Sequence, residues 1–139
     1  MRHWLVGTQE VGANDFAAVR EVRTGSWVGR RHHRQGIATQ MRAAVLHLAF
    51  AGLGAESARS EAFTDNPASL AVSRKFGYEP DGTSLRARRG VRATQQRLHL
   101  TRERWERFQT GPAGMPVWID GREPCLPLFG LETATEPNT

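Results

Sequence analysis

The stretch "RRHHRQGIAT", residues 30–39, places three arginines and two histidines immediately before a segment that is expected to be a helix. The N-terminus of a helix is already the positive end of its dipole, so these side chains strengthen the local field instead of neutralising it. Gly36 allows close approach of the backbone, Ala38 is small, and the amides of a first helical turn have no intrahelical partner. The stretch therefore predicts a site that holds an anion such as a phosphate, with a plain solvated loop as the alternative.

The segments that follow this stretch are expected to be a helix, a strand and a second helix. Over residues 36–53 apolar side chains recur at helical spacing, and two glycines close the pattern. Residues 56–63 are expected to form a short strand. The second helix, ending near residue 77, begins at Asp65-Asn66-Pro67, where Asp65 or Asn66 is the cap and Pro67 occupies the first turn.

The outer segments complete the predicted order of elements. Residues 4–11 favour a strand, and residues 16–28 favour one long bent strand or two short ones. After the second helix, residues 83–88 and 91–100 flank an Arg-Gly turn and predict a hairpin, and Thr101 caps the short helix TRERWERF. The order strand, loop, helix, strand, helix and hairpin predicts an α/β fold.

Composition limits the class of protein. The chain has 139 residues, 39% apolar and 24% charged, which is typical of one globular domain. It contains no apolar run of about 18 residues and no signal peptide, and its single cysteine, Cys125, cannot form an internal disulfide, so a cytoplasmic protein is expected. The net charge is +5, but the arginines do not form a long stripe with interleaved aromatic residues, which disfavours nucleic-acid binding.

The last part of the chain differs in composition from the rest. Residues 1–110 are expected to form the domain, and residues 111–139 a tail rich in glycine and proline. Its final residues are expected to be disordered. The apolar side chains available to dock the tail are Trp118, Leu126, Leu128 and Phe129.

Three segments in order resemble a known family. HRQGIA, residues 33–38, resembles the pyrophosphate-binding loop of the GCN5-related N-acetyltransferases (GNAT), whose pattern is Gln or Arg, two residues, Gly, one residue, then Gly or Ala. GSWVG precedes it, and DNPASLAVSRKFGY, residues 65–78, follows it and resembles the Asn-x-x-Ser…Lys-x-Gly-Phe/Tyr segment of the ribosomal-protein N-terminal acetyltransferases, the RimJ/RimL-like branch. His33 departs from the family pattern, which favours Gln or Arg there.

The resemblance implies a mixed sheet flanked by helices and a site for acetyl-CoA or another acyl-CoA, with no metal. The chain would lack the family's N-terminal strand and two helices, which form one wall of the acceptor site. An upstream start or coverage by a second copy in a homodimer would supply that wall, and the alternative is a domain of marginal stability. Asn66 and Ser69 would contact CoA. Backbone groups of Trp27 and Val28 would pair with the pantetheine arm, and the pyrophosphate would be held by the amides of His33, Arg34, Gln35, Gly36, Ile37, Ala38 and Thr39.

The implied reaction is direct attack of a primary amine on the acyl-CoA thioester. The acyl group would be acetyl or succinyl, and the amine a protein N-terminus, a lysine or a small molecule. Many relatives place a tyrosine as the acid that protonates the leaving thiolate, and Ser73 stands at that position here. Glu61 and Glu21 are candidate bases, with exposed strand carboxylates as the alternative for each. A CoA-binding protein of the same fold that has lost catalysis is the second hypothesis.

Overall fold

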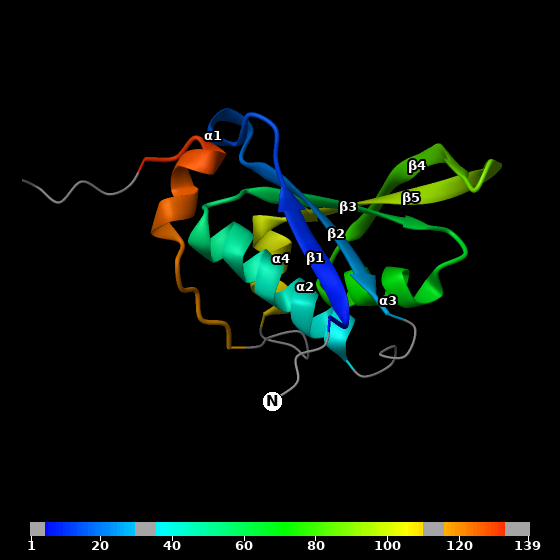
Figure 1. Cartoon of the computed structure of the whole chain (residues 1–139), viewed down its shortest axis with the longest axis horizontal. Helices are drawn as coiled ribbons and strands as arrows, with labels where there is room; N and C mark the ends of the chain where they lie inside the picture. The colour runs from blue at the N-terminus through cyan, green and yellow to red at the C-terminus, as the bar shows by residue number, and fades with distance from the viewer. Residues whose placement is uncertain (1–4, 30–35, 110–115, 133–139) are drawn as a thin grey trace, which may run out of the picture.

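Five strands form one mixed sheet in the order β1-β2-β3-β5-β4 (Figure 1). The computed structural model describes residues 5–29, 36–109 and 116–132, except the side chain of Trp27. Strands β2 and β3 are parallel, and the other neighbouring pairs are antiparallel. The strands are β1 (Gly7–Gly12), β2 (Glu21–Val28), β3 (Ser57–Phe63), β4 (Glu79–Arg88) and β5 (Val91–Thr101).

Helices cover one face of this sheet and connect its strands. The crossover that the parallel pair requires is made by α2, which continues directly into a π-helical segment, η2. None of the helices in the described part of the chain is long and apolar enough to cross a membrane. The helical elements are α1 (Phe16–Val19), α2 (Ile37–His47), η2 (Leu48–Gly52), α3 (Pro67–Lys75), α4 (Arg102–Phe108) and the 3₁₀ segment η3 (Glu123–Phe129).

The core lies between the sheet and these helices. Leu46 of α2 and Phe50 of η2 are fully buried, together with Val22 and Leu100 of the sheet. Phe50 also stacks on Trp105 of α4, with ring centroids 5.0 Å apart. Side chains alternate along a strand, so the neighbours of a buried strand residue point to the opposite face of the sheet. Most of the side chains on that face are charged or polar. The sheet therefore has one dry face and one polar face.

The expected fold class is confirmed, and one element differs. Residues 16–19 form the single helical turn α1 and not a strand, so β2 begins at Glu21. Asp15 and Arg20, on either side of the turn, have left-handed φ values of 51° and 56°. The turn buries Phe16, whose ring meets that of Phe129 edge-on at 5.7 Å. This tertiary contact outweighs the β-propensity of the segment.

Two further differences concern the hairpin and the tail. Strand β4 begins at Glu79, four residues earlier than expected, and contains an irregularity in its pairing between Pro80 and Thr83. In the tail, Leu126 is buried and Phe129 packs against the core, but Trp118 and Leu128 are exposed, at 87% and 83%. The end of the tail that was expected to be disordered, residues 133–139, lies outside the described residues.

Candidate functional site

The two parallel strands separate soon after they meet. Strands β2 and β3 pair over three positions only, the last of which joins Arg23 to Arg59. Beyond that point β2 continues along β1 while β3 continues along β5 (Figure 1). At the point of separation the Thr24 hydroxyl lies 3.4 Å from the Arg59 carbonyl oxygen and 3.1 Å from the Tyr78 hydroxyl. The separated segment of β2 leaves the backbone groups of its inner edge unpaired by β3, and these can bind an extended ligand that carries amides.

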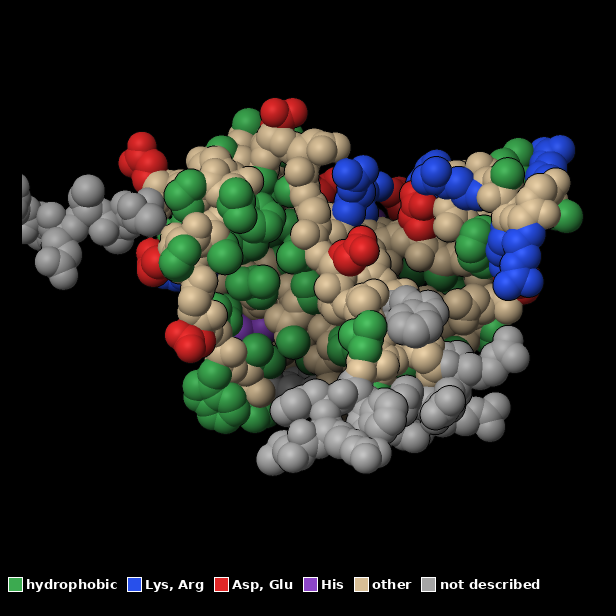
Figure 2. All heavy atoms as spheres, in the orientation of Figure 1, with side chains coloured by type: hydrophobic (Ala, Val, Ile, Leu, Met, Phe, Trp, Pro, Cys, Tyr) green, Lys and Arg blue, Asp and Glu red, His purple; other side chains and the backbone are tan. Residues whose placement is uncertain are grey.

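A cleft of about 320 Å³ lies on the polar face at this separation. Residues of four strands line it, and charged side chains of both signs gather on this half of the molecule, whereas apolar side chains dominate the other half (Figure 2). The lining includes Thr24 and Gly25 at the separation, Glu61 of β3, and the four arginines Arg23, Arg59, Arg86 and Arg97.

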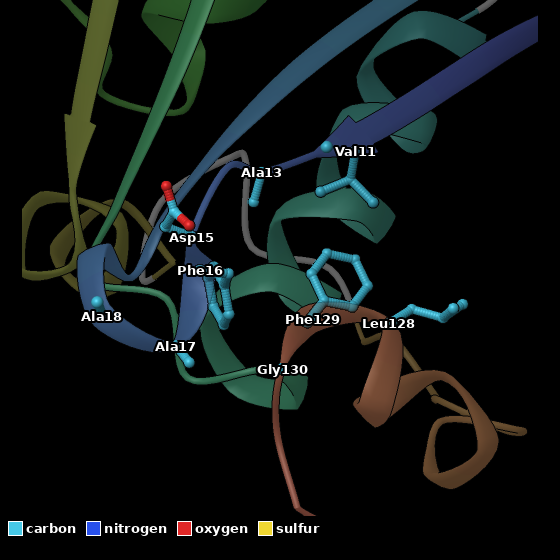
Figure 3. A pocket seen from close by; sticks show the side chains of 10 residues that line it. Val11, Ala13, Asp15, Phe16, Ala17, Ala18, Leu128, Phe129 and Gly130 are labelled. Carbon is cyan, nitrogen blue, oxygen red and sulfur yellow. The ribbon is translucent and has the colours of Figure 1, made fainter.

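A larger hollow of about 560 Å³ lies elsewhere, between α1 and η3 (Figure 3). Its walls are mostly apolar and include Val11, Phe16 and Phe129. Among the described residues that line it, Asp15 is the single titratable one. Because it offers so few reactive groups, the cleft beside β2 and β3 is the stronger candidate site.

The N-terminus of α2 has the geometry expected of an anion site. Gly36 caps the helix with φ of +76°, a conformation that glycine adopts without strain. A Cβ atom there would meet no atom of the described residues within 4 Å. Ile37, Ala38 and Thr39 form the first turn, which contains no acidic residue. The amides of a first helical turn have no intrahelical partner, so they are available to an anion. The remaining predicted cradle residues, His33, Arg34 and Gln35, lie outside the described residues.

The other residues expected to contact the donor lie on two elements. Asn66 caps α3, since its Oδ1 accepts a hydrogen bond of 3.2 Å from the Ser69 amide, and Pro67 follows at the first helical position. Trp27 and Val28 are the last residues of β2, in the segment that has separated from β3. Their backbone therefore borders the opening, as an interaction with an extended arm requires.

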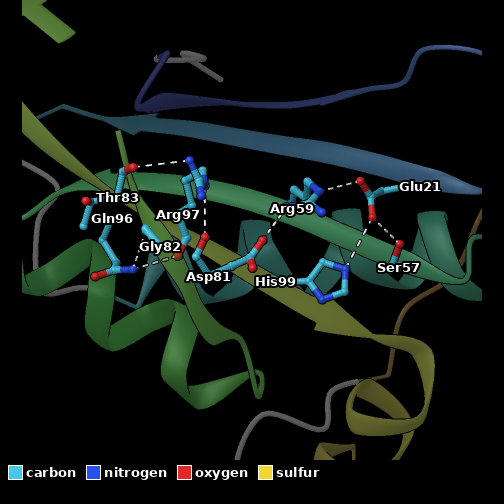
Figure 4. A network of polar contacts seen from close by, with 9 residues as sticks. All are labelled: Glu21, Ser57, Arg59, Asp81, Gly82, Thr83, Gln96, Arg97 and His99. Carbon is cyan, nitrogen blue, oxygen red and sulfur yellow. Dashed lines mark hydrogen bonds and ion pairs between the residues drawn. The ribbon is translucent and has the colours of Figure 1, made fainter. Parts of the chain in front are cut away.

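Glu21 lies at the closed end of the separation and is held by three donors (Figure 4). Its carboxylate accepts hydrogen bonds of 2.6 Å from Ser57 Oγ and from Arg59 Nε, and His99 Nε2 lies 3.3 Å away. Burial opposes ionisation of Glu21, but these hydrogen bonds and the charge of Arg59 outweigh it, and the pKa of Glu21 lies below its ordinary value. Arg59 also donates to Asp81 at 2.5 Å. A carboxylate bound in this way is a weak base.

Glu61 and Ser73 have very different surroundings. Glu61 lines the cleft, and its side chain is 37% exposed. Its one ion pair with a described residue, to Arg86 Nη2, is long at 3.4 Å. Ser73 is fully buried on the helical side of the sheet, and its hydroxyl accepts a hydrogen bond of 3.1 Å from Arg42 Nη1. Of the candidate residues for proton transfer, Glu61 is thus the one that faces open space in the cleft.

Two arginines of this region were not identified from the sequence. Arg42 is only 2% exposed, with its guanidinium 5.3 Å from the centre of the Tyr78 ring. Its position off the apolar stripe of the helix gave no sign of burial. Arg97 donates a hydrogen bond to the Asp81 carbonyl oxygen, in the irregular part of β4 that includes Gly82. A single glycine in the sequence does not predict this irregularity. Within the described part of the chain, no group of three or more His, Cys, Asp or Glu side chains is placed to hold a metal ion.

Comparison with known proteins gives a consistent result. Residues 3–79 match the family model described as the acetyltransferase (GNAT) domain. Three solved structures share the fold. A "Probable acetyltransferase" has a TM-score of 0.66 and 21% identity over 72% of this chain and 57% of its own. The spermidine N-acetyltransferase SpeG from Vibrio cholerae has a TM-score of 0.65 and 16% identity, over 72% of this chain and 60% of its own. A GNAT-family acetyltransferase from Bacillus anthracis has a TM-score of 0.63 and 15% identity, over 70% of this chain and 59% of its own. The chain thus spans about 60% of the length of these structures.

Proposed function

The chain belongs to the GNAT acetyltransferase family, and from that premise we propose that it moves an acyl group from acyl-CoA to a primary amine. The observation that carries the proposal is the separation of β2 from β3 next to a charged cleft, with the open N-terminus of α2 following β2 in the chain. Family membership suggests acetyl-CoA as the donor. The amine would approach through the cleft.

Donor binding would use backbone groups. The amides of Gly36, Ile37, Ala38 and Thr39 would hold the pyrophosphate at the positive end of α2, together with the preceding residues 33–35. The pantetheine arm would run along the segment of β2 that has separated from β3. Asn66 and Ser69 are at the start of α3, where the side chain that caps the helix also borders solvent.

The reaction needs one proton to leave the ammonium before the amine attacks the thioester carbonyl. We assign this step to Glu61, directly or through a water molecule, because it is the one carboxylate among the described residues that line the cleft. A C–N bond then forms, the C–S bond breaks, and the thiolate of CoA takes up a proton. Thiolate is a good leaving group, so the buried Ser73 need not act as an acid, and Glu21 orients Arg59. Glu61→Gln should lower kcat by about 10²–10⁴-fold.

Calorimetry with acetyl-CoA and succinyl-CoA tests donor binding. Gly36→Glu would place a side chain and a negative charge where the pyrophosphate is expected, so micromolar binding should be lost. Gly90→Glu is the matched control, because Gly90 also has a positive φ and open space around it but lies in the hairpin turn. In the wild type, ligand at 100 times Kd should stabilise the fold by about 2.7 kcal/mol. Unchanged binding by Gly36→Glu would remove the proposed site, and binding without transfer to any amine would identify a CoA-binding protein.

The RimJ/RimL-like branch is a finer proposal, supported by the sequence of α3 and its flanks. DNPASLAVSRKFGY combines the Asn66 cap with the Lys-x-Gly-Tyr ending of that branch. It suggests a protein N-terminus as acceptor. Two kinds of short peptide separate this acceptor from an internal lysine. One kind has a free N-terminus and no lysine, and the other has a lysine and a blocked N-terminus.

A further inference from the structure

The arginines of the cleft differ in how their charge is balanced. Arg59 is paired with Glu21 and Asp81, and Arg86 contacts Glu61. Among the described residues, no carboxylate lies within ion-pair distance of Arg97 or Arg23. The cleft therefore carries positive charge that the described carboxylates do not neutralise.

Arg97 is held in place by backbone carbonyls and not by an acid. The pairing of β4 with β5 is irregular between Pro80 and Thr83, and two backbone carbonyls of this bulge contact the guanidinium of Arg97 (Figure 4). Arg97 Nε donates to the Asp81 carbonyl oxygen at 2.9 Å, and Nη1 donates to the Thr83 carbonyl oxygen at 3.2 Å. A guanidinium has five N–H donors; two are used here, and three have no partner among the described residues. Its orientation is fixed. The hydrogen bond and ion pair with Arg59 lower the pKa of Asp81, and the charge of Arg97 adds to this effect without an ion pair of its own to that carboxylate.

Gly82 makes this arrangement possible. It has φ of +87°, and a Cβ atom there would lie 2.5 Å from Arg97 Nη2. The amide of Gln96 donates to the Gly82 carbonyl oxygen at 2.8 Å and fixes the bulge further. Bulges beside functional sites commonly serve to redirect a side chain.

The bulge also separates a pair of opposite charges. Glu61 lies directly opposite Arg97 in the register of β3 with β5, a placement in which a cross-strand ion pair is expected. Arg97 instead turns to the bulge, and Glu61 is left with the long contact to Arg86. The cleft thus presents a fixed cation and a lightly engaged carboxylate side by side on neighbouring strands.

We propose that this cleft recognises a carboxylate on the amine acceptor, bound by Arg97 with support from Arg23, while the amine lies toward Glu61. The inference rests on the proposed acyl transfer and names its acceptor class: an amine with a carboxylate nearby, such as an acidic amino acid or a peptide whose second residue is acidic. A planar guanidinium binds a carboxylate through two parallel hydrogen bonds. The products are the N-acyl amino carboxylate and CoA with its thiol protonated.

Position within the sheet favours the acceptor over the acyl group as the source of the carboxylate. Strand β5, which carries Arg97, is two strand spacings from β2, or about 10 Å, and Arg97 turns farther away, toward carbonyls of β4. A short acyl group on a thioester bound along β2 would therefore meet Arg23 of β2 before Arg97. A polyamine such as the spermidine named for SpeG would bring further positive charge toward Arg97. This cleft should therefore disfavour polyamines.

Steady-state transfer from acetyl-CoA to matched acceptors tests the inference. The small-molecule arm compares glutamate with glutamine, the peptide arm compares Ser-Glu-Ala with Ser-Gln-Ala, and spermidine is the cationic reference. We expect kcat/KM to be about 10–100-fold higher for the carboxylate member of at least one pair, mainly through KM. Arg97→Gln should abolish that ratio, and Arg23→Gln should reduce it. Arg92→Gln, an exposed arginine of β5 outside the cleft, is the control and should leave the ratio unchanged.

Product binding supplies a test that needs no turnover. Calorimetry should show N-acetylglutamate binding at least tenfold more tightly than N-acetylglutamine, or the corresponding acetylated peptides in the same order, and Arg97→Gln should remove the difference. Melting temperatures and acetyl-CoA binding show whether each variant is folded.

Equal binding of both products, or faster transfer to spermidine that Arg97→Gln leaves unaltered, overturns the inference while acyl transfer itself stands. A preference for succinyl-CoA that depends on Arg97, without discrimination between acceptors, also overturns the inference. It would show that Arg97 binds a carboxylate on the acyl group of the donor. Acetyl-CoA binding without transfer to any amine contradicts the proposed function, and product binding then decides the inference alone.

Discussion

Removal of the Ser73 hydroxyl should destabilise the protein with little effect on catalysis. Ser73 is fully buried and accepts a hydrogen bond from Arg42, which is 2% exposed and whose Nε already has no partner among the described residues. Ser73→Ala leaves a second donor of this buried cation unsatisfied. Such a loss costs about 1–3 kcal/mol. For a chain of this length each kcal/mol lowers Tm by about 4 °C, so a decrease of about 4–12 °C is expected.

Urea unfolding and the transfer rate per folded molecule separate the two roles. The matched control is Ser84→Ala, because Ser84 Oγ is buried without a partner in the described part of the chain, so its removal should be neutral or stabilising. Ser73→Ala should change kcat by less than about tenfold, whereas a general acid contributes about 10²–10⁴-fold. A Tm equal to that of the wild type with a kcat reduced 100-fold would show that Ser73 donates a proton to the leaving group.

Three further predictions concern the polar network, the helix cap and the bulge. The pKa of Glu21 is lowered in the folded protein, so its ionised form stabilises the fold at pH values above its ordinary pKa. This contribution is lost as the pH falls through the lower folded pKa. In urea titrations, the unfolding free energy of Glu21→Gln should therefore vary less than that of the wild type between about pH 6 and pH 3. Asn66→Ala should cost about 1 kcal/mol through loss of the cap, and a simultaneous rise in KM for acetyl-CoA would show that Asn66 also contacts the donor. Gly82→Ala should displace Arg97 and reduce the preference for carboxylate acceptors in the same kinetic assay, and an unchanged preference would show that the bulge does not set it.

Elements with a local signal could be predicted from the sequence. Asn66 followed by Pro67 indicated the start of α3, and Thr101 indicated the start of α4; both side chains accept the capping hydrogen bond in the structure. Gly36 lies at the predicted start of α2 in a left-handed conformation. These features depend on a few neighbouring residues and on backbone geometry, so the sequence of each segment is sufficient.

Elements that depend on distant contacts could not be predicted. The segment at residues 16–19 has strand-like composition, but Phe16 packs against Phe129 of the tail, more than 100 positions away, and the segment forms a helical turn. The burial of Arg42 likewise requires Ser73 and Tyr78, which belong to another helix and to the segment after it. A side chain that finds its partner through tertiary packing leaves no periodic pattern in the sequence.

The same distinction separates the two halves of the candidate site. The proposed donor half would use backbone amides at the start of one helix and along one strand edge, so a short motif with glycine at the right place is enough to indicate it. The acceptor half depends on which arginine is neutralised, and residue type alone does not decide that. Arg59 and Arg97 both lie on the polar face, but Arg59 reaches two carboxylates, whereas the bulge at Gly82 turns Arg97 away from Glu61 and toward carbonyl oxygens. Without that bulge, Glu61 and Arg97 would be placed to neutralise each other, and the cleft would lose its free cation and its available carboxylate together. The specificity that we propose for the cleft would therefore depend on one irregularity in the sheet.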